Sequence, residues 1–216
     1  MGGQPDGQDE TGRLRAAGAD RDRVLGELFE AHRARLMRMV ELRMDPRLKA
    51  RLGASDVLQD AFVEVRNRLE DYLDEPRMPF FLGLRQTAAQ RLAMLYRHHI
   101  GTQKRDARRQ VSLAHPAFPA ATSAALVDRL FADQTTPSTG AARMEMRAQL
   151  ERFLEQMKRE DREVLVLRHF EELSNAETAQ ELGLDESAAS KRYIRALKRL
   201  RASMEEAAGS ADDPQA

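Results

Sequence analysis

The chain has 216 residues, of which 42% are hydrophobic, 32% are charged and only 5% are aromatic. This composition is typical of a soluble globular protein and favours helices rich in Leu and Ala over a β-sandwich, which needs aromatic and β-branched residues. Cysteine is absent, which excludes disulfides, thiolate metal sites and a cysteine nucleophile, and the 35 basic and 35 acidic residues leave no net charge.

Residues 1–20 are rich in Gly, Gln, Asp and Arg and offer little to bury, so we expect a disordered tail there. They contain no apolar stretch of the kind that a signal peptide has. The most apolar short run, residues 80–84, is too short to cross a bilayer. We therefore expect a cytoplasmic protein.

Three amphipathic helices are predicted in the first half of the chain. The first runs from about residue 21 and ends before Asp45-Pro46, because a residue that precedes proline avoids the helical region. The second covers 55–73, with Ser55 as its N-cap, and the third covers about 80–99. Acids predominate over 55–75 and bases over 85–109, so the neutral average conceals an acidic segment followed by a basic one.

The composition changes over 116–140, where prolines and many Ala, Thr and Ser residues surround a short apolar patch at 126–131. This is typical of a linker with at most one helical turn inside it. Such a long connection is unusual within one compact domain, so we place a domain boundary here. The fold class that follows is all-α, with a helical bundle over 21–115, a flexible linker over 116–140, a second helical module over 141–207, and a disordered tail over 208–216.

The most informative stretch is 174–201. Ser174 and Glu177 have the spacing of a capping box, Gly183 ends that helix after two turns, and Asp185 can cap a second, longer helix. Ala179 is small where the two helices would cross. This order of a short helix, a glycine turn and a longer helix predicts a helix-turn-helix within a four-helix C-terminal module.

Charge separates across this unit, because 171–186 contains acids and no base whereas 187–201 contains bases and no acid. We interpret the second helix as a DNA-binding element whose early residues face base edges and whose later arginines hold phosphates. The predicted DNA contacts of this helix are Ser187, Ala188, Ser190, Lys191, Arg192, Arg195 and Arg199.

Residues 161–201 resemble the C-terminal promoter-reading domain of extracytoplasmic-function (ECF) sigma factors of the sigma-70 family. The run Ala188-Ala189-Ser190-Lys191-Arg192-Tyr193 is similar to a subgroup abundant in planctomycete-like bacteria. In the first module, residues 55–62 resemble the family's "E-D-x-x-Q-[ED]-x-F" segment, which binds the clamp helices of core RNA polymerase. The resemblance implies polymerase contacts by Asp56, Gln59, Asp60 and Phe62, and an acidic face at helical spacing suits a basic partner helix.

The third helix and its basic extension, 80–109, are similar to the region with which that family binds and opens the start-proximal promoter element. Aromatic and basic side chains there can stack on splayed bases and hold the backbone. The resemblance implies DNA contacts by Arg85, Arg91, Tyr96, Arg97, His98, Lys104 and Arg105. The chain departs from the family pattern at Gly83, where Trp is expected, and at Met94, where Asp is common.

Enzyme motifs for phosphate loops, serine hydrolases and zinc proteases are missing from the sequence, so we expect a protein that is not an enzyme and has no metal or cofactor. The expected partners are core RNA polymerase, promoter DNA and an anti-sigma factor, with no membrane and no small-molecule substrate. Two alternatives stay open, a helix-turn-helix regulator that acts without polymerase and a helical adaptor that never touches DNA.

Overall fold

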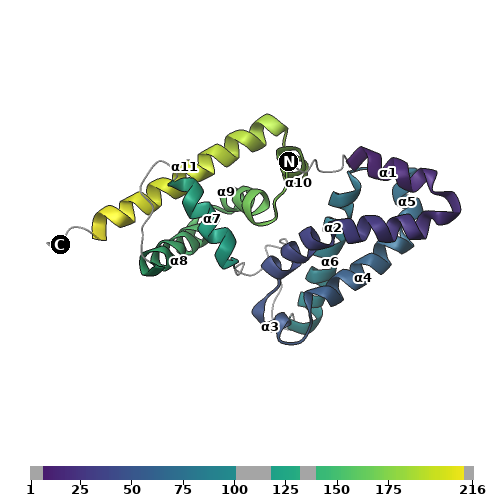
Figure 1. Ribbon diagram of the computed structural model, residues 1–216, viewed down its shortest axis with the longest axis horizontal. Helices are drawn as coiled ribbons and strands as arrows, with labels where there is room; N and C mark the ends of the chain where they lie inside the picture. Colours follow the sequence, from purple (N-terminus) through teal and green to yellow (C-terminus); the bar gives the residue numbers. More distant parts are fainter. Residues whose placement is uncertain (1–6, 101–117, 132–139, 212–216) are drawn as a thin grey trace. The chain divides into compact units, whose positions relative to one another are not determined.

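The computed structural model describes residues 7–100, 118–131 and 140–211, and every regular element in these ranges is helical (Figure 1). The chain divides into two compact units, residues 1–116 and 117–216. The predicted all-α architecture of two modules is therefore confirmed. Within the described ranges, no helix combines the length and the apolar character that a membrane span requires.

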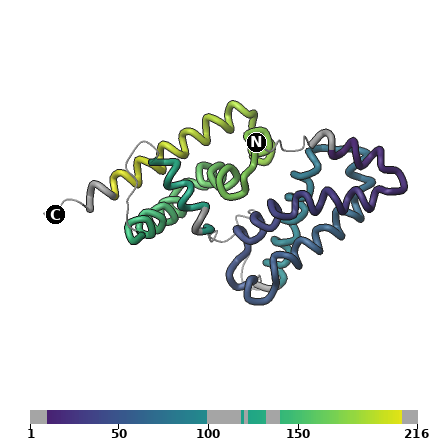
Figure 2. The backbone as a smooth tube through the Cα atoms, viewed as in Figure 1, coloured from purple at the N-terminus to yellow at the C-terminus, as the bar shows by residue number. Residues whose placement is uncertain are grey.

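Three long helices build the first unit: α2 (Arg21–Arg43), α4 (Ala54–Asn67) and α6 (Phe80–Ile100). They pack against one another and run side by side (Figure 2). Apolar side chains at helical spacing place one face of each helix in the core. The buried positions include Leu25, Leu36 and Val40 of α2, Val57, Leu58 and Ala61 of α4, and Leu84, Ala88 and Leu92 of α6.

Two short helices connect the three long ones. Asp45 caps α3 (Pro46–Lys49) by accepting a hydrogen bond from the Arg47 amide at 2.8 Å, and Pro46 occupies the first turn, where its missing N–H costs nothing. The expected stop before Asp45-Pro46 is thus confirmed. The second predicted helix is divided into two, because α4 ends at Asn67 and α5 (Leu69–Asp74) follows after a break at Arg68.

A helix that the sequence did not predict precedes α2. We expected a disordered tail over 1–20, but α1 (Gly7–Ala16) packs on α2, α5 and α6. Its one large apolar anchor, Leu14, is fully buried, and Glu10 Oε1 lies 2.6 Å from Nε2 of the buried His32. Thr11 and Tyr72 share a further hydrogen bond of 2.8 Å between their hydroxyls. Composition missed this helix because polar contacts with distant residues hold most of it in place.

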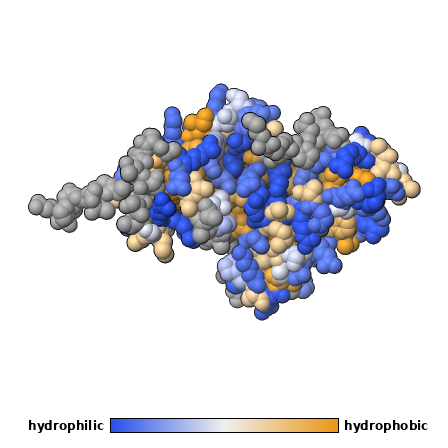
Figure 3. Space-filling model, in the orientation of Figure 1, coloured by the Kyte–Doolittle hydropathy of each residue, from blue (hydrophilic) through white to orange (hydrophobic). Residues whose placement is uncertain are grey.

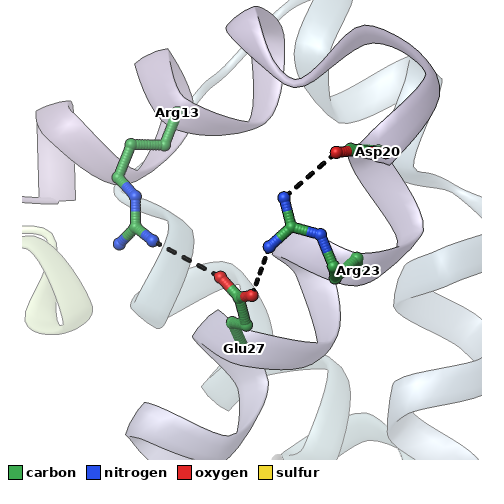
Figure 4. A network of polar contacts seen from close by, with 4 residues as sticks. All are labelled: Arg13, Asp20, Arg23 and Glu27. Carbon is green, nitrogen blue, oxygen red and sulfur yellow. Dashed lines mark hydrogen bonds and ion pairs between the residues drawn. The ribbon is translucent and has the colours of Figure 1, made fainter.

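Ion pairs fix the turn from α1 into α2, which passes through a short 3₁₀ turn, η1 (Gly18–Asp20). The Arg23 guanidinium bridges Glu27 at 2.5 Å and Asp20 at 3.1 Å, and Arg13 of α1 approaches the same Glu27 at 3.9 Å (Figure 4). These side chains are all exposed, so water and salt screen each pair and its contribution to stability is small. Together they orient α1 rather than anchor it.

The second unit contains α7 (Ala120–Leu130), α8 (Gly140–Gln156), α9 (Arg159–Leu165), η2 (Val166–Phe170), α10 (Asn175–Leu182) and α11 (Glu186–Ala211). α11 packs on α8, α9 and α10. The η2 segment is a π-helical turn that continues α9. The core of this unit includes Leu150, Leu154, Val164, Leu165, Leu167, Phe170, Ala189, Ala196 and Leu200.

The segment interpreted as a linker, 116–140, is not all linker. α7 packs on α8 and η2, where it buries Leu126 and Val127, and the Phe118 ring lies 4.6 Å from that of Phe170. The apolar patch at 126–131 is the buried face of α7, which the surrounding Pro, Ala, Thr and Ser residues obscured. Residues 132–139 lie outside the described ranges, as do 116 and 117. The C-terminal tail predicted over 208–216 is wrong for residues 208–211, because α11 continues to Ala211, and residues 212–216 lie outside the described ranges.

Hydrophilic side chains predominate on the face shown in Figure 3, and hydrophobic ones appear there in small separate groups. Among the described residues, the large hydrophobic side chains that remain exposed are Val63, Met94, Met144 and Ile194. Val63 lies on α4, Met94 on α6 and Ile194 on α11, the three helices to which the sequence assigned binding roles. Met144 lies on α8, where a single exposed apolar residue needs no explanation.

Two glycines are expected to respond oppositely to alanine. Gly83 lies inside α6, and a Cβ there would meet only the Tyr72 ring, at 4.0 Å, so Gly83→Ala should stabilise the protein by about 0.5–1 kcal/mol. Gly183 ends α10 at φ 64°, so Gly183→Ala should destabilise it by about 1–2 kcal/mol. Urea unfolding followed by circular dichroism measures both. Equal effects of the two substitutions would contradict the backbone assignments.

Candidate nucleic-acid interface

Local hydrogen bonds build the two helices of the predicted helix-turn-helix. The Ser174 hydroxyl accepts from the Glu177 amide at 3.1 Å, and the Glu177 carboxylate accepts from the Ser174 amide at 2.8 Å. The predicted capping box is therefore confirmed. Gly183 ends α10 in the left-handed conformation, and the Asp185 carboxylate caps α11 by accepting from the Ala188 amide at 2.7 Å.

The turn between α10 and α11 is held from both sides. The Asn175 side-chain amide donates to the Glu186 carbonyl at 2.9 Å, and the Leu184 amide donates to the Ala179 carbonyl at 2.8 Å. Ala179 and Ala189 are both buried, which lets the two helices approach closely. These short-range contacts therefore fix the geometry of the turn and hold α11 in place against α10.

The exposed face of α11 carries most of the predicted DNA contacts. Its first half places Ser187, Lys191 and Arg195 in solvent and leaves Ala188, Ser190 and Arg192 half-buried. Sequence analysis missed Ile194, which is 48% exposed on this basic helix. An exposed apolar side chain that lies among basic side chains can contact a thymine methyl group in the major groove. Its spacing of three from Lys191 was the available signal.

Arg199 forms an ion pair within the unit although its side chain is exposed. Its guanidinium forms an ion pair with Asp161 of α9, although its side chain remains 59% accessible. The sequence predicted a phosphate contact here, and in the structure a carboxylate already neutralises part of that charge. Since α9 packs on α11, this pair depends on tertiary packing that charge patterning along one helix does not reveal.

His169 of η2 supports α11 through a contact with Tyr193. Its Nε2 lies 2.9 Å from the Tyr193 hydroxyl, and the two rings are 5.6 Å apart. Burial, together with the nearby charges of Arg129 and Arg168, lowers the pKa of His169 to about 4. The imidazole is therefore neutral at physiological pH.

We expect the second unit to lose stability as the pH falls from about 6.5 to about 4. The unfolded chain takes up a proton at His169 in this window while the folded chain does not, so the loss reaches at most about 3 kcal/mol. Hydrogen exchange of α10 and α11 in the wild type and in His169→Gln, compared at each pH, measures it. The glutamine variant should lack this part of the pH dependence, and identical profiles would contradict the assignment.

The acidic helix α4 of the first unit presents three of its four predicted polymerase contacts to solvent. Asp56, Gln59 and Asp60 are exposed, but two of them also have local roles. The N-cap of the helix is Gly53 and not Ser55, and the Asp56 carboxylate accepts from the Gly53 amide at 2.9 Å. Asp60 pairs with Arg91 of α6 at 2.7 Å.

A shallow groove lies between α2 and α4 beside these residues. Its volume is about 420 Å³, and its apolar lining is formed by Phe29, Leu58 and Phe62. Phe62 is half-buried and packs edge-on against Phe29 at 4.8 Å. Gln59 also lines the groove, and Glu30, Arg33 and Ser55 supply polar atoms. Two of the four predicted contacts, Gln59 and Phe62, thus line a groove with an apolar floor, which can accept a protruding side chain from a partner helix, whereas Asp56 and Asp60 do not line it.

The structure separates the predicted DNA contacts of α6 into three classes. Arg97 and His98 are exposed near the end of the helix, and Tyr96 is half-buried beside them. Arg91 is half-buried in its pair with Asp60. Arg85 is only 3% exposed, so its assignment as a DNA contact is wrong: the side chain belongs to the interior of the unit. Lys104 and Arg105 lie outside the described residues.

The two departures from the family pattern have different surroundings. Gly83 lies beside a second cavity of about 430 Å³ that Tyr72 and Phe80 also line, so the position has room for a larger side chain. Met94 is 49% exposed on α6.

Comparison with protein families adds an independent observation. Residues 147–200 match the family model for sigma-70, region 4. The second unit therefore contains a sigma-70 region 4 domain, which begins within α8, includes α10 and ends within α11. The match covers about a quarter of the chain, and a search of curated proteins finds none that matches this chain. Sigma-70 region 4 is a DNA-binding, non-enzymatic transcription domain, and this agrees with the basic face of α11.

Proposed function

We propose that this chain is an ECF-type sigma factor that binds core RNA polymerase and directs promoter-specific initiation. α11 reads the upstream promoter element, α4 and its groove bind the clamp helices, and the end of α6 engages the start-proximal element. The observation that carries the proposal is the exposed basic face of α11 within a region that matches sigma-70 region 4. The exposed acidic residues of α4 and the apolar groove that Gln59 and Phe62 of the same helix line support the polymerase contact.

Further parts of the proposal follow from the same assignment. The protein acts in the cytoplasm, where its polymerase is, and it is regulated by an anti-sigma factor. It has no catalytic role of its own and needs no cofactor or metal. We further propose that it belongs to the planctomycete-type subgroup, which the resemblance of residues 188–193 supports. α7 belongs to the DNA-binding unit, so the connection between the modules is shorter than 116–140.

Co-migration with core polymerase tests the proposal against its two alternatives. The full chain is mixed with core enzyme and separated by size exclusion, and its binding to promoter DNA is measured in parallel. Co-migration is the expected result. A chain that binds DNA and does not co-migrate would instead be a regulator that acts without polymerase, and a chain that binds neither would be an adaptor.

A further inference from the structure

A second basic surface lies in the first unit, on α3 and the turn that follows it. We call it the α3 corner and define it as Arg47, Lys49 and Arg51. All three side chains are exposed, and residues 46–51 include no acid. The sequence analysis assigned no role to this segment, because its short helix falls between the longer amphipathic ones.

The α3 corner is held in a fixed place beside α6. Asp45, which is only 5% exposed, accepts from the Arg47 guanidinium at 3.1 Å and 3.0 Å. The adjacent Leu48 is 1% exposed and anchors α3 in the core of the unit. Arg47 Nη2 also lies 3.4 Å from the hydroxyl of Tyr96, and α3 packs on α6. The corner therefore adjoins the end of α6, where Arg97 and His98 are exposed.

The charges at this corner are not balanced locally. Asp45 neutralises part of the Arg47 charge, but among the described residues Lys49 and Arg51 have no acidic partner. Two unpaired cations, Lys49 of α3 and Arg51 of the turn that follows it, then lie in the corner that adjoins Tyr96 and the basic end of α6. Aromatic residues that stack on bases, flanked by cations that follow the backbone, are the arrangement with which proteins bind single-stranded nucleic acid.

We propose that the α3 corner binds the phosphate backbone of a DNA strand whose bases engage Tyr96, Arg97 and His98. The proposal rests on the DNA-binding role assigned above to the end of α6, and it extends that interface onto a different element. Lys49 and Arg51 hold phosphates. Arg47 is a positioning residue, because its contacts with Asp45 and Tyr96 set the place of the corner.

The test uses the full chain and a single-stranded oligonucleotide of mixed sequence. Lys49→Ala/Arg51→Ala is compared with Arg68→Ala/Arg77→Ala, which removes two exposed bases elsewhere in the same unit. The slope of log affinity against log salt should fall by about 1.4 in the first variant, or about 0.7 for each lost phosphate contact, and should stay unchanged in the control. An equal decrease in both variants would show a general charge effect and overturn the proposal.

A crosslinking experiment gives a second readout that does not depend on affinity. Because the chain has no cysteine, Lys49→Cys and Arg68→Cys each create a unique site for a photocrosslinker. We expect crosslinks to the strand from position 49 and not from position 68. Wild-type binding that is lost in Arg97→Ala and retained in Lys49→Ala/Arg51→Ala would overturn the corner alone. A wild-type chain that binds no single strand would contradict the role of α6 as well, while co-migration with polymerase would still support the proposed function.

Discussion

Lys191→Ala/Arg195→Ala is expected to weaken promoter binding at least about tenfold, since one base contact is worth about 1–3 kcal/mol. Both side chains are exposed on α11, so their removal leaves the helix-turn-helix intact. The salt slope should also fall by about one unit for each of these residues that holds a phosphate. Lys191 is the main candidate for a base contact and Arg195 for a phosphate contact, so the single variants should differ in sequence preference.

The matched control is Arg152→Ala/Lys158→Ala, which removes two exposed bases of the same unit that lie outside α10 and α11. Fluorescence anisotropy with the promoter duplex and with a scrambled duplex, each over a salt series, measures affinity, preference and slope. If the α11 variant and the control lose affinity equally, net charge rather than this helix drives binding.

Asp60→Lys is expected to weaken binding to core polymerase about 30-fold or more, as the loss of an interface hot spot of about 2 kcal/mol or more would do. Asp60 is exposed on the acidic helix α4, and a lysine there would repel a basic partner helix. The substitution also breaks the ion pair with Arg91, so a structural effect must be separated from a binding effect.

Glu70→Lys provides that separation. Glu70 is an exposed acid on α5 that pairs with Arg21, so this variant makes the same charge change and also breaks an ion pair with arginine. Polymerase binding by Glu70→Lys should stay close to that of the wild type. Asp56→Asn is a further useful variant, because the amide oxygen can still accept from the Gly53 amide and preserve the cap. Equal affinities for Asp60→Lys and Glu70→Lys would refute the α4 surface.

The parts of the fold that sequence predicted well are those with local causes. The capping box at Ser174, the stop at Gly183 and the N-cap at Asp185 each depend on residues a few positions apart, and each lies where it was expected. The same is true of the end of α2, where Pro46 begins a new helix. Periodicity alone was also sufficient for the core faces of α2, α4 and α6.

The parts that sequence did not predict depend on contacts between distant residues. α1 is docked by Glu10 with His32, a pair separated by 22 positions, and nothing near Glu10 indicates this pairing. The burial of Arg85 and the pairing of Asp60 with Arg91 likewise appear only once α4 packs on α6. α7 was missed for a related reason, because its buried face is short and the elements on which it packs, α8 and η2, lie further along the chain.

Run-off transcription tests the central claim most directly. Core polymerase is combined with the full chain on a template that carries a promoter selected by the chain itself, and transcripts are compared with those from core polymerase alone. The account predicts a discrete run-off product that requires the chain and is lost with Lys191→Ala/Arg195→Ala or with Asp60→Lys. Transcription that is equally random with and without the chain would contradict it.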